Sequence, residues 1–360
     1  MFCLPNTLAA RVTIPLAVAV LGPTVAAGTA VASTPPDSAA EAVWPVEVEH
    51  AFGTTVIPEE PVRVVSVGIA EQDMILALGV APVGVSEWYG EQPFATWPWA
   101  QDELGDAEPT VLLRDDGLQY ERIAALEPDL IVGTNAGLDQ EEYDLLSDIA
   151  PTIAHGMGAE SYAENWDDQT IRIGQALGRE PEAEAIVADI RQRFADAAAA
   201  HPEFAGTPIY LLQGGFYDGE AIALIAGGGT QFLTDLGFEV PTTINEFVPA
   251  SDPTQAYIPM ENLAVLDDAE LLLWGTESAD DRAALEAQPL YQQLAAVQAG
   301  RLVFTDETLA GAMWFRSPLS WDYVLDEMVP MLAATMADEG PQAAFDADQP
   351  DTTEVPTTES

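Results

Sequence analysis

The sequence contains no lysine, and this shortage of positive charge excludes whole classes of partner. All 11 basic residues are arginine, and 60 Asp and Glu residues bring the formal net charge to -49 at pH 7. A field of that sign repels nucleic acid and anionic lipid. It also favours solubility at high ionic strength, where salt screens the repulsion between like charges. We therefore expect no nucleic-acid partner, and the composition is typical of a salt-adapted host.

Residues that carry catalysis or bind metals are also scarce. The only cysteine, Cys3, precedes an apolar stretch typical of an export signal, so we expect no disulfide and no thiol chemistry in the mature chain. His50, His155 and His201 lie far apart without metal-site spacing, and we interpret each as a surface or capping residue. The glycine run at 227–230 fits a plain strand-to-helix turn better than an anion-binding loop. We predict no enzyme activity, no metal site and no cofactor.

Residues 1–32 have the order of a signal peptide. Arg11 precedes an apolar run at 12–27, and small residues follow it up to Ala32. A transmembrane anchor is the weaker alternative, because the run is shorter than about 20 residues and contains two prolines. We expect cleavage after Ala32 and export to the periplasm or the cell surface.

The remaining chain is long enough for two domains, and its pattern predicts an α/β fold. Residues 33–45 are predicted to form a disordered linker, and residues 338–360 a disordered acidic tail. Between them, short apolar runs alternate with helical periodicity, as in a sheet covered by helices. The predicted strands lie at 62–67, 81–86, 129–133, 208–213, 269–275 and 301–305.

A repeated segment predicts two similar lobes. The segments YERIAALEPDLIV and MENLAVLDDAELLL align without gaps, and the alignment pairs Glu121 with Glu261. We place the N-terminal lobe at 46–160, a connecting helix at 161–178 and the C-terminal lobe at 179–337. The alternative, in which the helices cover one continuous sheet, stays open because periodicity does not distinguish the two arrangements.

Candidate ligand-binding residues follow the predicted strands, because open α/β sheets bind ligands beyond the carboxyl ends of their strands. Aromatic side chains are concentrated there, and their rings offer apolar faces to a bulky ligand. Any one of them alone is more often a core residue than a binding residue. The aromatic candidates are Trp88, Tyr89, Phe216, Tyr217, Trp274 and Trp314.

Two arginines in predicted loops complete the candidate site. Arg114 and Arg316 lie near the same strand ends, and either could bind an anionic oxygen through two parallel hydrogen bonds. For Arg114, a surface ion pair is an equally good interpretation. The arginines in predicted helices are expected to pair with the abundant surface carboxylates.

The chain resembles the iron-siderophore and cobalamin substrate-binding proteins of ABC importers, from about residue 46 to residue 335. Both the order and the spacing of the matching segments fit that family. The segments are HAFGTTVIPEEPVRVVSVG (50–68), DMILALGVAPVGVS (73–86), YERIAALEPDLIVG (120–133), EEYDLLSDIAPTIA (141–154), TQFLTDLGF (230–238), ENLAVLDDAELLL (261–273) and LYQQLAAVQAGRLVF (290–304).

The resemblance implies two Rossmann-like α/β lobes joined by a single long helix, with a shallow cleft between them, limited hinge motion and no catalysis. It also implies that one glutamate in each lobe docks onto the membrane permease, and the matching positions are Glu121 and Glu261. Many relatives carry a cysteine at the cleavage site. Here the only cysteine precedes the apolar run, so the sequence does not predict a lipid anchor.

The implied ligand is a ferric siderophore, captured by a monomer and delivered to the permease, with iron present only inside the ligand. Because few arginines lie near the expected cleft, a neutral ferric hydroxamate is favoured over a highly anionic tris-catecholate. Cobalamin or haem is the alternative within the same fold. Haem is the weaker of the two, because its iron usually needs a well-placed axial ligand. A solute sensor without a transport role is the remaining alternative.

Overall fold

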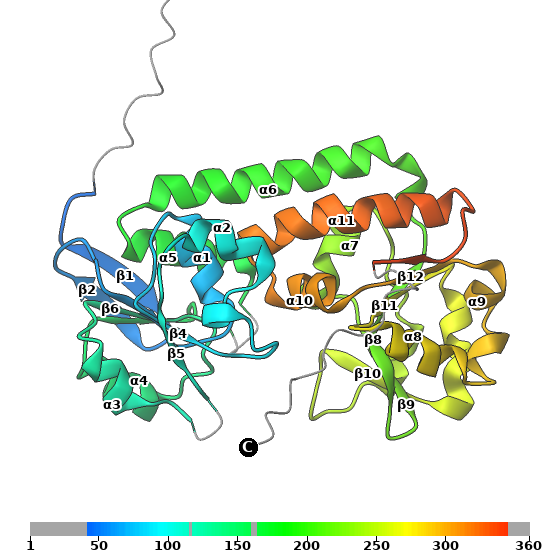
Figure 1. Ribbon diagram of the computed structural model, residues 1–360, viewed down its shortest axis with the longest axis horizontal. Coiled ribbons are helices and arrows are strands. Elements are labelled where there is room, and N and C mark those ends of the chain that lie inside the picture. Colours follow the sequence, from blue (N-terminus) through cyan, green and yellow to red (C-terminus); the bar gives the residue numbers. More distant parts are fainter. Residues whose placement is uncertain (1–41, 115–116, 160–163, 345–360) are drawn as a thin grey trace, which may run out of the picture. The chain divides into compact units, whose positions relative to one another are not determined.

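The computed structural model describes residues 42–114, 117–159 and 164–344. The predicted signal peptide and most of the predicted linker and acidic tail lie outside the described residues. The described chain forms two α/β lobes, each built around its own sheet (Figure 1).

The N-terminal lobe contains a parallel sheet with the strand order β5-β4-β3-β6-β7 and a separate antiparallel hairpin, β1-β2. The strands of this sheet are short and almost wholly buried, because helices cover both of its faces. The strands are β1 (Val46–His50), β2 (Gly53–Ile57), β3 (Val64–Ser66), β4 (Gly84–Ser86), β5 (Thr110–Leu112), β6 (Leu130–Gly133) and β7 (Thr152–Ala154). The helices are α1 (Glu71–Ala77), η1 (Pro93–Ala95), η2 (Pro98–Ala100), α2 (Gln101–Leu104), α3 (Tyr120–Ala125), α4 (Gln140–Ser147) and α5 (Trp166–Ala176).

The C-terminal lobe contains a mixed sheet with the strand order β10-β9-β8-β11-β12-β13. Strands β8, β11, β12 and β13 are parallel, while β9 and β10 add antiparallel strands at one edge. The strands are β8 (Ile209–Tyr217), β9 (Glu220–Leu224), β10 (Gln255–Pro259), β11 (Leu271–Gly275), β12 (Leu302–Phe304) and β13 (Gln342–Ala343). The helices are η3 (Pro202–Phe204), η4 (Gly228–Thr230), α7 (Gln231–Asp235), η5 (Thr243–Phe247), η6 (Met260–Asp268), α8 (Ala279–Glu286), η7 (Tyr291–Gln293), α9 (Ala295–Ala299), α10 (Glu307–Phe315) and α11 (Pro318–Met336).

The long helix that crosses between the lobes is α6 (Glu180–Ala200), which lies later in the chain than the predicted connector at 161–178. Its first half contributes Ala183 to the core of the N-terminal lobe, and its second half contributes Phe194 to the core of the C-terminal lobe. The predicted connector contains α5, which packs inside the N-terminal lobe. The chain turns at Gly178, whose φ of 68° is in the left-handed region that glycine favours, and this turn separates the two helices.

Helix α11 lies beside α6 and also reaches both lobes (Figure 1). Most of its apolar side chains enter the C-terminal core, while Leu319 in its first turn packs on the N-terminal lobe. The predicted single connecting helix is therefore accompanied by a second one, and both helices contact the two lobes.

The structure differs from the predicted disordered ends where it describes them. Trp44, placed in the predicted linker, packs against the N-terminal core. In the predicted tail, Gln342–Ala343 form β13, which pairs in parallel with β12. An unpaired edge strand exposes backbone N–H and C=O groups, so this short pairing protects the edge of β12.

Candidate functional site

A cavity of about 940 Å³ lies between the two lobes. The N-terminal lobe contributes Trp88 and Tyr89, and the C-terminal lobe provides the rest of the wall. Four of the aromatic candidates predicted from the sequence meet here, together with one of the two predicted arginines. They are Trp88, Tyr89, Tyr217, Trp314 and Arg316.

The aromatic residues make the apolar part of this wall. Trp88 and Tyr217 are 39% and 51% exposed, so part of each ring is left uncovered by the protein. Trp314 fits close to the sheet because Gly275 has no side chain: a Cβ atom at that position would lie 2.8 Å from Cζ2 of Trp314. The hydroxyl of Tyr89 is buried and has no hydrogen-bond partner among the described residues.

Arg316 supplies the positive charge in the wall of the larger cavity. It ends α10 in the left-handed conformation, with φ and ψ both 50°, and it is half-buried. Burial lowers the pKa of its guanidinium below the usual value. No described residue forms a hydrogen bond or ion pair with its side chain, and it is the only cation of the described chain that lines the larger cavity.

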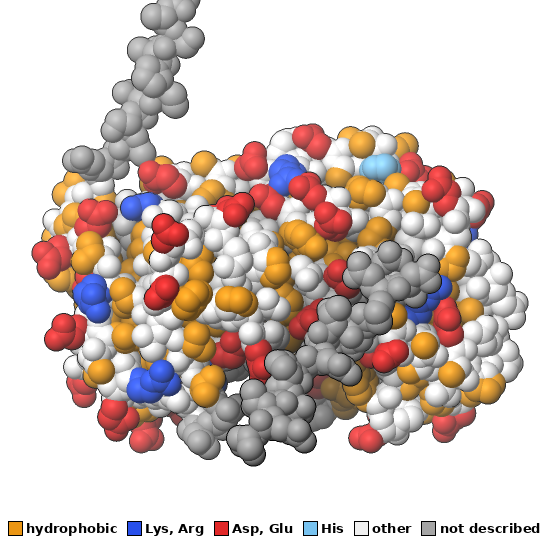
Figure 2. Space-filling view, in the orientation of Figure 1, with side chains coloured by type: hydrophobic (Ala, Val, Ile, Leu, Met, Phe, Trp, Pro, Cys, Tyr) orange, Lys and Arg blue, Asp and Glu red, His pale blue; other side chains and the backbone are white. Residues whose placement is uncertain are grey.

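This lack of a partner distinguishes Arg316 from the other described arginines. Acidic side chains are scattered over the visible face of the molecule, with far fewer basic ones among them (Figure 2). Each of the other described arginines donates to a carboxylate or to a carbonyl oxygen. These arginines are Arg63, Arg114, Arg122, Arg172, Arg179, Arg191, Arg193, Arg282 and Arg301.

A smaller cavity of about 400 Å³ adjoins the first one. It is lined by side chains of α5, α6, α7 and α11, including Trp166 and Phe194, and it shares Gly228 and Arg316 with the larger cavity. Arg316 therefore lies where the two cavities meet.

Three predicted ligand residues lie elsewhere. Trp274 is fully buried in the C-terminal core, because its position within β11 turns the indole away from the cavity. Phe216 packs on the same core, and the centroid of its ring lies 5.9 Å from that of Trp274. Arg114 donates to the backbone oxygens of Val67 and Ala136 at 3.1 and 2.7 Å, and so braces two loops of the N-terminal lobe.

Two acidic residues in the cavity wall were not predicted. Asp252 and Glu277 both line the larger cavity. Burial raises the pKa of Glu277, and the nearby Asp281 and Glu307 raise it further. Among 60 acidic residues, nothing in the local sequence distinguishes these two. Together they offset the charge of Arg316.

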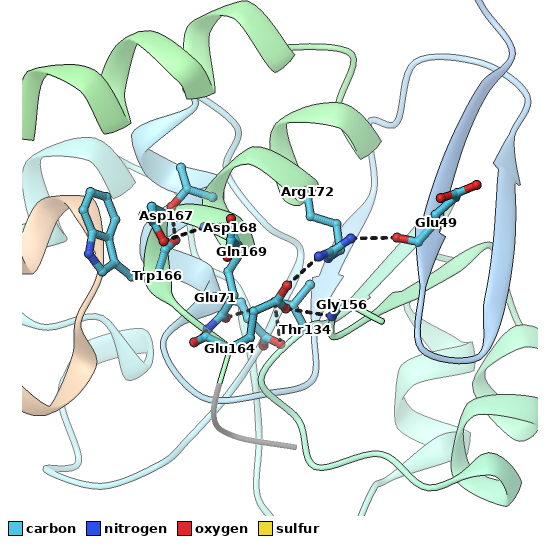
Figure 3. Close-up of polar contacts among 11 residues, drawn as sticks. Glu49, Glu71, Thr134, Gly156, Glu164, Trp166, Asp167, Asp168, Gln169 and Arg172 are labelled. Atoms are coloured by element: carbon cyan, nitrogen blue, oxygen red, sulfur yellow. Dashed lines mark hydrogen bonds and ion pairs between the residues drawn. The ribbon is translucent and has the colours of Figure 1, made fainter. Parts of the chain in front are cut away.

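A buried carboxylate also escaped prediction. Glu71, at the start of α1, is fully buried and lies at the ends of β3 and β6 (Figure 3). It accepts hydrogen bonds from Ser66 Oγ at 3.0 Å, from the N–H of Gly68 at 2.7 Å and from the N–H of Asn135 at 2.6 Å. Burial nevertheless raises its pKa to about 7, because the loss of water outweighs these donors. Thr134, at 3.4 Å, is a fourth donor.

The two predicted docking residues are both exposed. Glu121 lies in the first turn of α3, as expected. Glu261 lies in the first turn of η6, which is a 3₁₀ helix and not the expected α-helix. Each precedes a central strand of its own lobe, β6 in one case and β11 in the other.

Two of the three histidines differ from the predicted surface or capping role, while His201 caps the end of α6 as predicted. His50 is fully buried and forms a 2.8 Å hydrogen bond with Thr55 Oγ1, and burial lowers its pKa to about 4. His155 is 8% exposed, and only His201 is partly open to solvent. Within the described ranges, no group of three His, Cys, Asp or Glu side chains could hold a metal ion. No helix in the described part of the chain combines the length and apolarity needed to cross a membrane.

Comparisons with known proteins agree with this architecture. A family model described as periplasmic binding protein matches residues 64–309. A periplasmic solute binding protein from Mycobacterium smegmatis is 46% identical, with a TM-score of 0.76 over 81% of this chain and 99% of that one. PiaA of Streptococcus pneumoniae, solved in complex with ferrichrome, is 25% identical, with a TM-score of 0.68 over 81% of this chain and 99% of that one. The probable siderophore-binding lipoprotein YfiY of Bacillus subtilis is 29% identical over 78% of this chain and 86% of its own length.

Proposed function

The chain belongs to the periplasmic binding protein family, and we propose that it captures a ferric siderophore in the cleft between its lobes and delivers it to an ABC importer. Similar proteins carry siderophore binding in their names, and one of them was solved with ferrichrome. The observation that carries the proposal is Arg316, the described arginine whose guanidinium lacks a protein partner in an aromatic cavity of about 940 Å³. A buried cation without a partner is costly, and a ligand oxygen would supply one.

The charge of the cavity favours a ferric hydroxamate. Arg316 is accompanied by Asp252 and Glu277 in the described wall, so the cavity offers no excess of positive charge. Burying a highly anionic tris-catecholate there would require several cations to offset the loss of hydration. A neutral tris-hydroxamate can pack between Trp88, Tyr217 and Trp314 while one of its oxygens accepts from Arg316.

Ligand titrations test both parts of this proposal. Quenching of tryptophan fluorescence would be measured with a ferric hydroxamate, a ferric tris-catecholate, cobalamin and haem. We expect the hydroxamate to bind most tightly and, at 100 times its Kd, to stabilise the fold by about 2.7 kcal/mol. Tighter binding of the catecholate would overturn the hydroxamate preference. Binding of cobalamin or haem, with no binding of either siderophore, would show that the proposed ligand class is wrong.

The role of Arg316 has a matched control. Arg316→Gln removes the cation from the cavity, and we expect the affinity for the ferric hydroxamate to fall about tenfold or more. Arg122→Gln makes the same change in net charge on the exposed surface of α3 and is expected to leave the affinity unchanged. Equal affinities of the two variants would show that Arg316 does not contact the ligand.

Delivery to a permease is proposed for Glu121 and Glu261. Both side chains are exposed. Glu121 is on α3, and Glu261 is on η6, which directly follows β10. In Figure 1, α3 and β10 both lie on the side of the molecule away from α6. Two carboxylates on separate lobes can engage two arginine clusters at once, which sets register as well as attraction. We expect the double variant Glu121→Ala and Glu261→Ala to bind ligand normally and to lose uptake. Normal uptake, or loss of ligand binding in the folded variant, would contradict this assignment.

Export of the chain is also proposed, with residues 1–32 as a cleaved signal peptide. The mass of the exported protein decides this, because cleavage after Ala32 without lipid predicts a product that begins at Ser33. A product that retains Cys3, or one that carries a lipid on a cysteine, would show that the amino terminus was misinterpreted.

A further inference from the structure

A buried carboxylate of the N-terminal lobe reaches across to the C-terminal lobe. Asp73 on α1 is fully buried. Its Oδ2 accepts a hydrogen bond from Trp99 Nε1 at 2.8 Å and another from Ser317 Oγ at 2.7 Å. Because Trp99 belongs to the same lobe as Asp73 and Ser317 belongs to the other, this single oxygen joins the two lobes.

Ser317 is the last residue of a short corner between α10 and α11. Its Oγ accepts from the N–H of Ser320 at 3.0 Å as the N-cap of α11, so its hydroxyl hydrogen remains available for Asp73. At the start of the corner, Phe315 is 4% exposed and packs among aromatic rings of the N-terminal lobe. Both neighbours of Arg316 are therefore held against the opposite lobe.

We propose that Asp73 is a positioning residue for the ligand site: by holding Ser317, it fixes the backbone at Arg316 and so the direction in which the guanidinium enters the cleft. Asp73 is not among the residues that line either cavity. A side chain already held in its binding geometry loses less entropy when the ligand arrives. The inference rests on the proposed function, since it concerns how Arg316 is presented to a siderophore.

The protonation state of Asp73 supplies a readout. Burial raises its pKa to about 6, while the hydrogen bonds from Ser317 and Trp99 act against this shift and the charge of Glu103 on α2 adds to it. A charged acceptor forms the stronger hydrogen bond, so the corner is held more firmly above this pKa than below it. We expect ligand affinity to weaken as the pH falls from about 7.5 to about 5. Glu71 on the same helix titrates nearby, but its hydrogen bonds go to residues of the N-terminal lobe.

A double-mutant cycle tests whether Asp73 acts through Arg316. Asp73→Asn keeps the side-chain shape and removes the charge, and we expect Kd for the ferric hydroxamate to rise about tenfold at pH about 7.5 and to vary less with pH than in the wild type. Because the two residues act as a unit, adding Asp73→Asn to Arg316→Gln should weaken binding no further. Additive losses, or an unchanged Kd for Asp73→Asn, would overturn the proposal.

A second pair of variants covers the case in which Asp73→Asn does not fold. Ser317→Ala removes the donor to Asp73 and should weaken binding, while Ser317→Thr keeps a hydroxyl and should restore it. Asp139→Ala removes a helix cap from α4, and Asp139 lines neither cavity, so this variant controls for the loss of capping alone. Similar affinities for Ser317→Ala and Asp139→Ala would count against the positioning role.

A measurement without ligand separates this inference from the proposed function. Hydrogen exchange of the amides at 315–320 should accelerate several-fold in Asp73→Asn and in Ser317→Ala, but not in Asp139→Ala. If the wild-type protein binds none of the chelates, the proposed function fails. Faster exchange in the two variants would still support the interaction by which Asp73 fixes the backbone around Ser317. If exchange at 315–320 is unchanged in both variants, the positioning role fails even when the siderophore binds.

Discussion

The two lobes end equivalent strands with different chemistry. Strands β6 and β11 each pair with the first parallel strand of their own sheet. Each strand ends in a glycine that a threonine follows, Gly133-Thr134 in one lobe and Gly275-Thr276 in the other. In the N-terminal lobe, the backbone beyond this step donates to the buried carboxylate of Glu71. In the C-terminal lobe, the equivalent N–H of Glu277 donates to the carboxylate of Asp281 at 3.0 Å, but that carboxylate is only partly buried.

The C-terminal strand end is closed by a pair of threonines. Thr276 Oγ1 donates to the backbone oxygen of Thr305 at 2.5 Å, and Thr305 Oγ1 donates to the backbone oxygen of Thr276 at 2.6 Å. Both residues are fully buried. The fully buried polar groups at these strand ends are thus an ionisable carboxylic acid in one lobe and two neutral hydroxyls in the other. Of these two strand ends, the one in the N-terminal lobe should therefore give the larger pH response of stability.

The largest expected effect tests whether β11 depends on apolar packing. Trp274→Ala removes a fully buried indole from the C-terminal core and should cost about 3 to 5 kcal/mol of unfolding free energy. Trp88→Ala removes an indole that is 39% exposed and should cost far less stability while weakening ligand binding. Urea denaturation and ligand titration of both variants measure this contrast. A stable Trp274→Ala variant that cannot bind ligand would show that Trp274 contributes to the ligand site and not mainly to the core.

The next effect concerns the buried glutamate. Glu71→Ala leaves the N–H groups of Gly68 and Asn135 without an acceptor, and we expect a loss of about 3 kcal/mol. Glu71→Gln keeps one acceptor oxygen and should lose less. Denaturant midpoints at constant pH measure both variants. If Glu71→Ala were as stable as the wild type, the carboxylate would not be what satisfies this strand end.

The pH dependence separates the lobes more finely. The pKa of Glu71 is about 7 in the folded protein and near 4.5 when unperturbed, so the folded state retains a proton that the unfolded chain releases. Stability should therefore fall as the pH rises from about 4.5 to about 7 and level off above that. Asp73, raised from 3.8 to about 6, contributes in the same direction over a lower window. Measurement in high salt removes the repulsion of the acidic surface, and Glu71→Gln should flatten the remaining slope.

The smallest expected effect belongs to the threonine pair. Thr276→Val removes one hydroxyl at nearly constant shape and should cost about 1 kcal/mol, because one neutral hydrogen bond is lost. This loss should be the same at every pH from about 5 to about 8. A pH-dependent loss would mean that the C-terminal strand end is coupled to a titrating group, and the contrast between the lobes would disappear.

The sequence by itself determined the α/β class of the fold, and its repeated segment predicted two lobes. Short buried strands such as Leu130–Gly133 and Leu271–Gly275 are apolar throughout, and this signal is local. Trp88, Tyr217 and Arg316 all line the larger cavity. Strand ends of a sheet meet at one edge, which accounts for Trp88 after β4 and Tyr217 at the end of β8, whereas Arg316 ends a helix. The missed strands are edge strands or antiparallel additions, for which the pattern is weaker.

Only the tertiary structure decided which of the predicted residues face the ligand space and which helix joins the lobes. Trp274 and Trp314 look alike as aromatic residues near strand ends, yet one fills the core and the other lines the cavity. Arg316 differs from Arg114 only because distant carbonyl groups occupy the latter. Local patterns set the type and the face of each element. The burial, hydrogen-bond partners and pKa of a side chain depend on which other elements pack on that face. These contacts join residues far apart in the sequence.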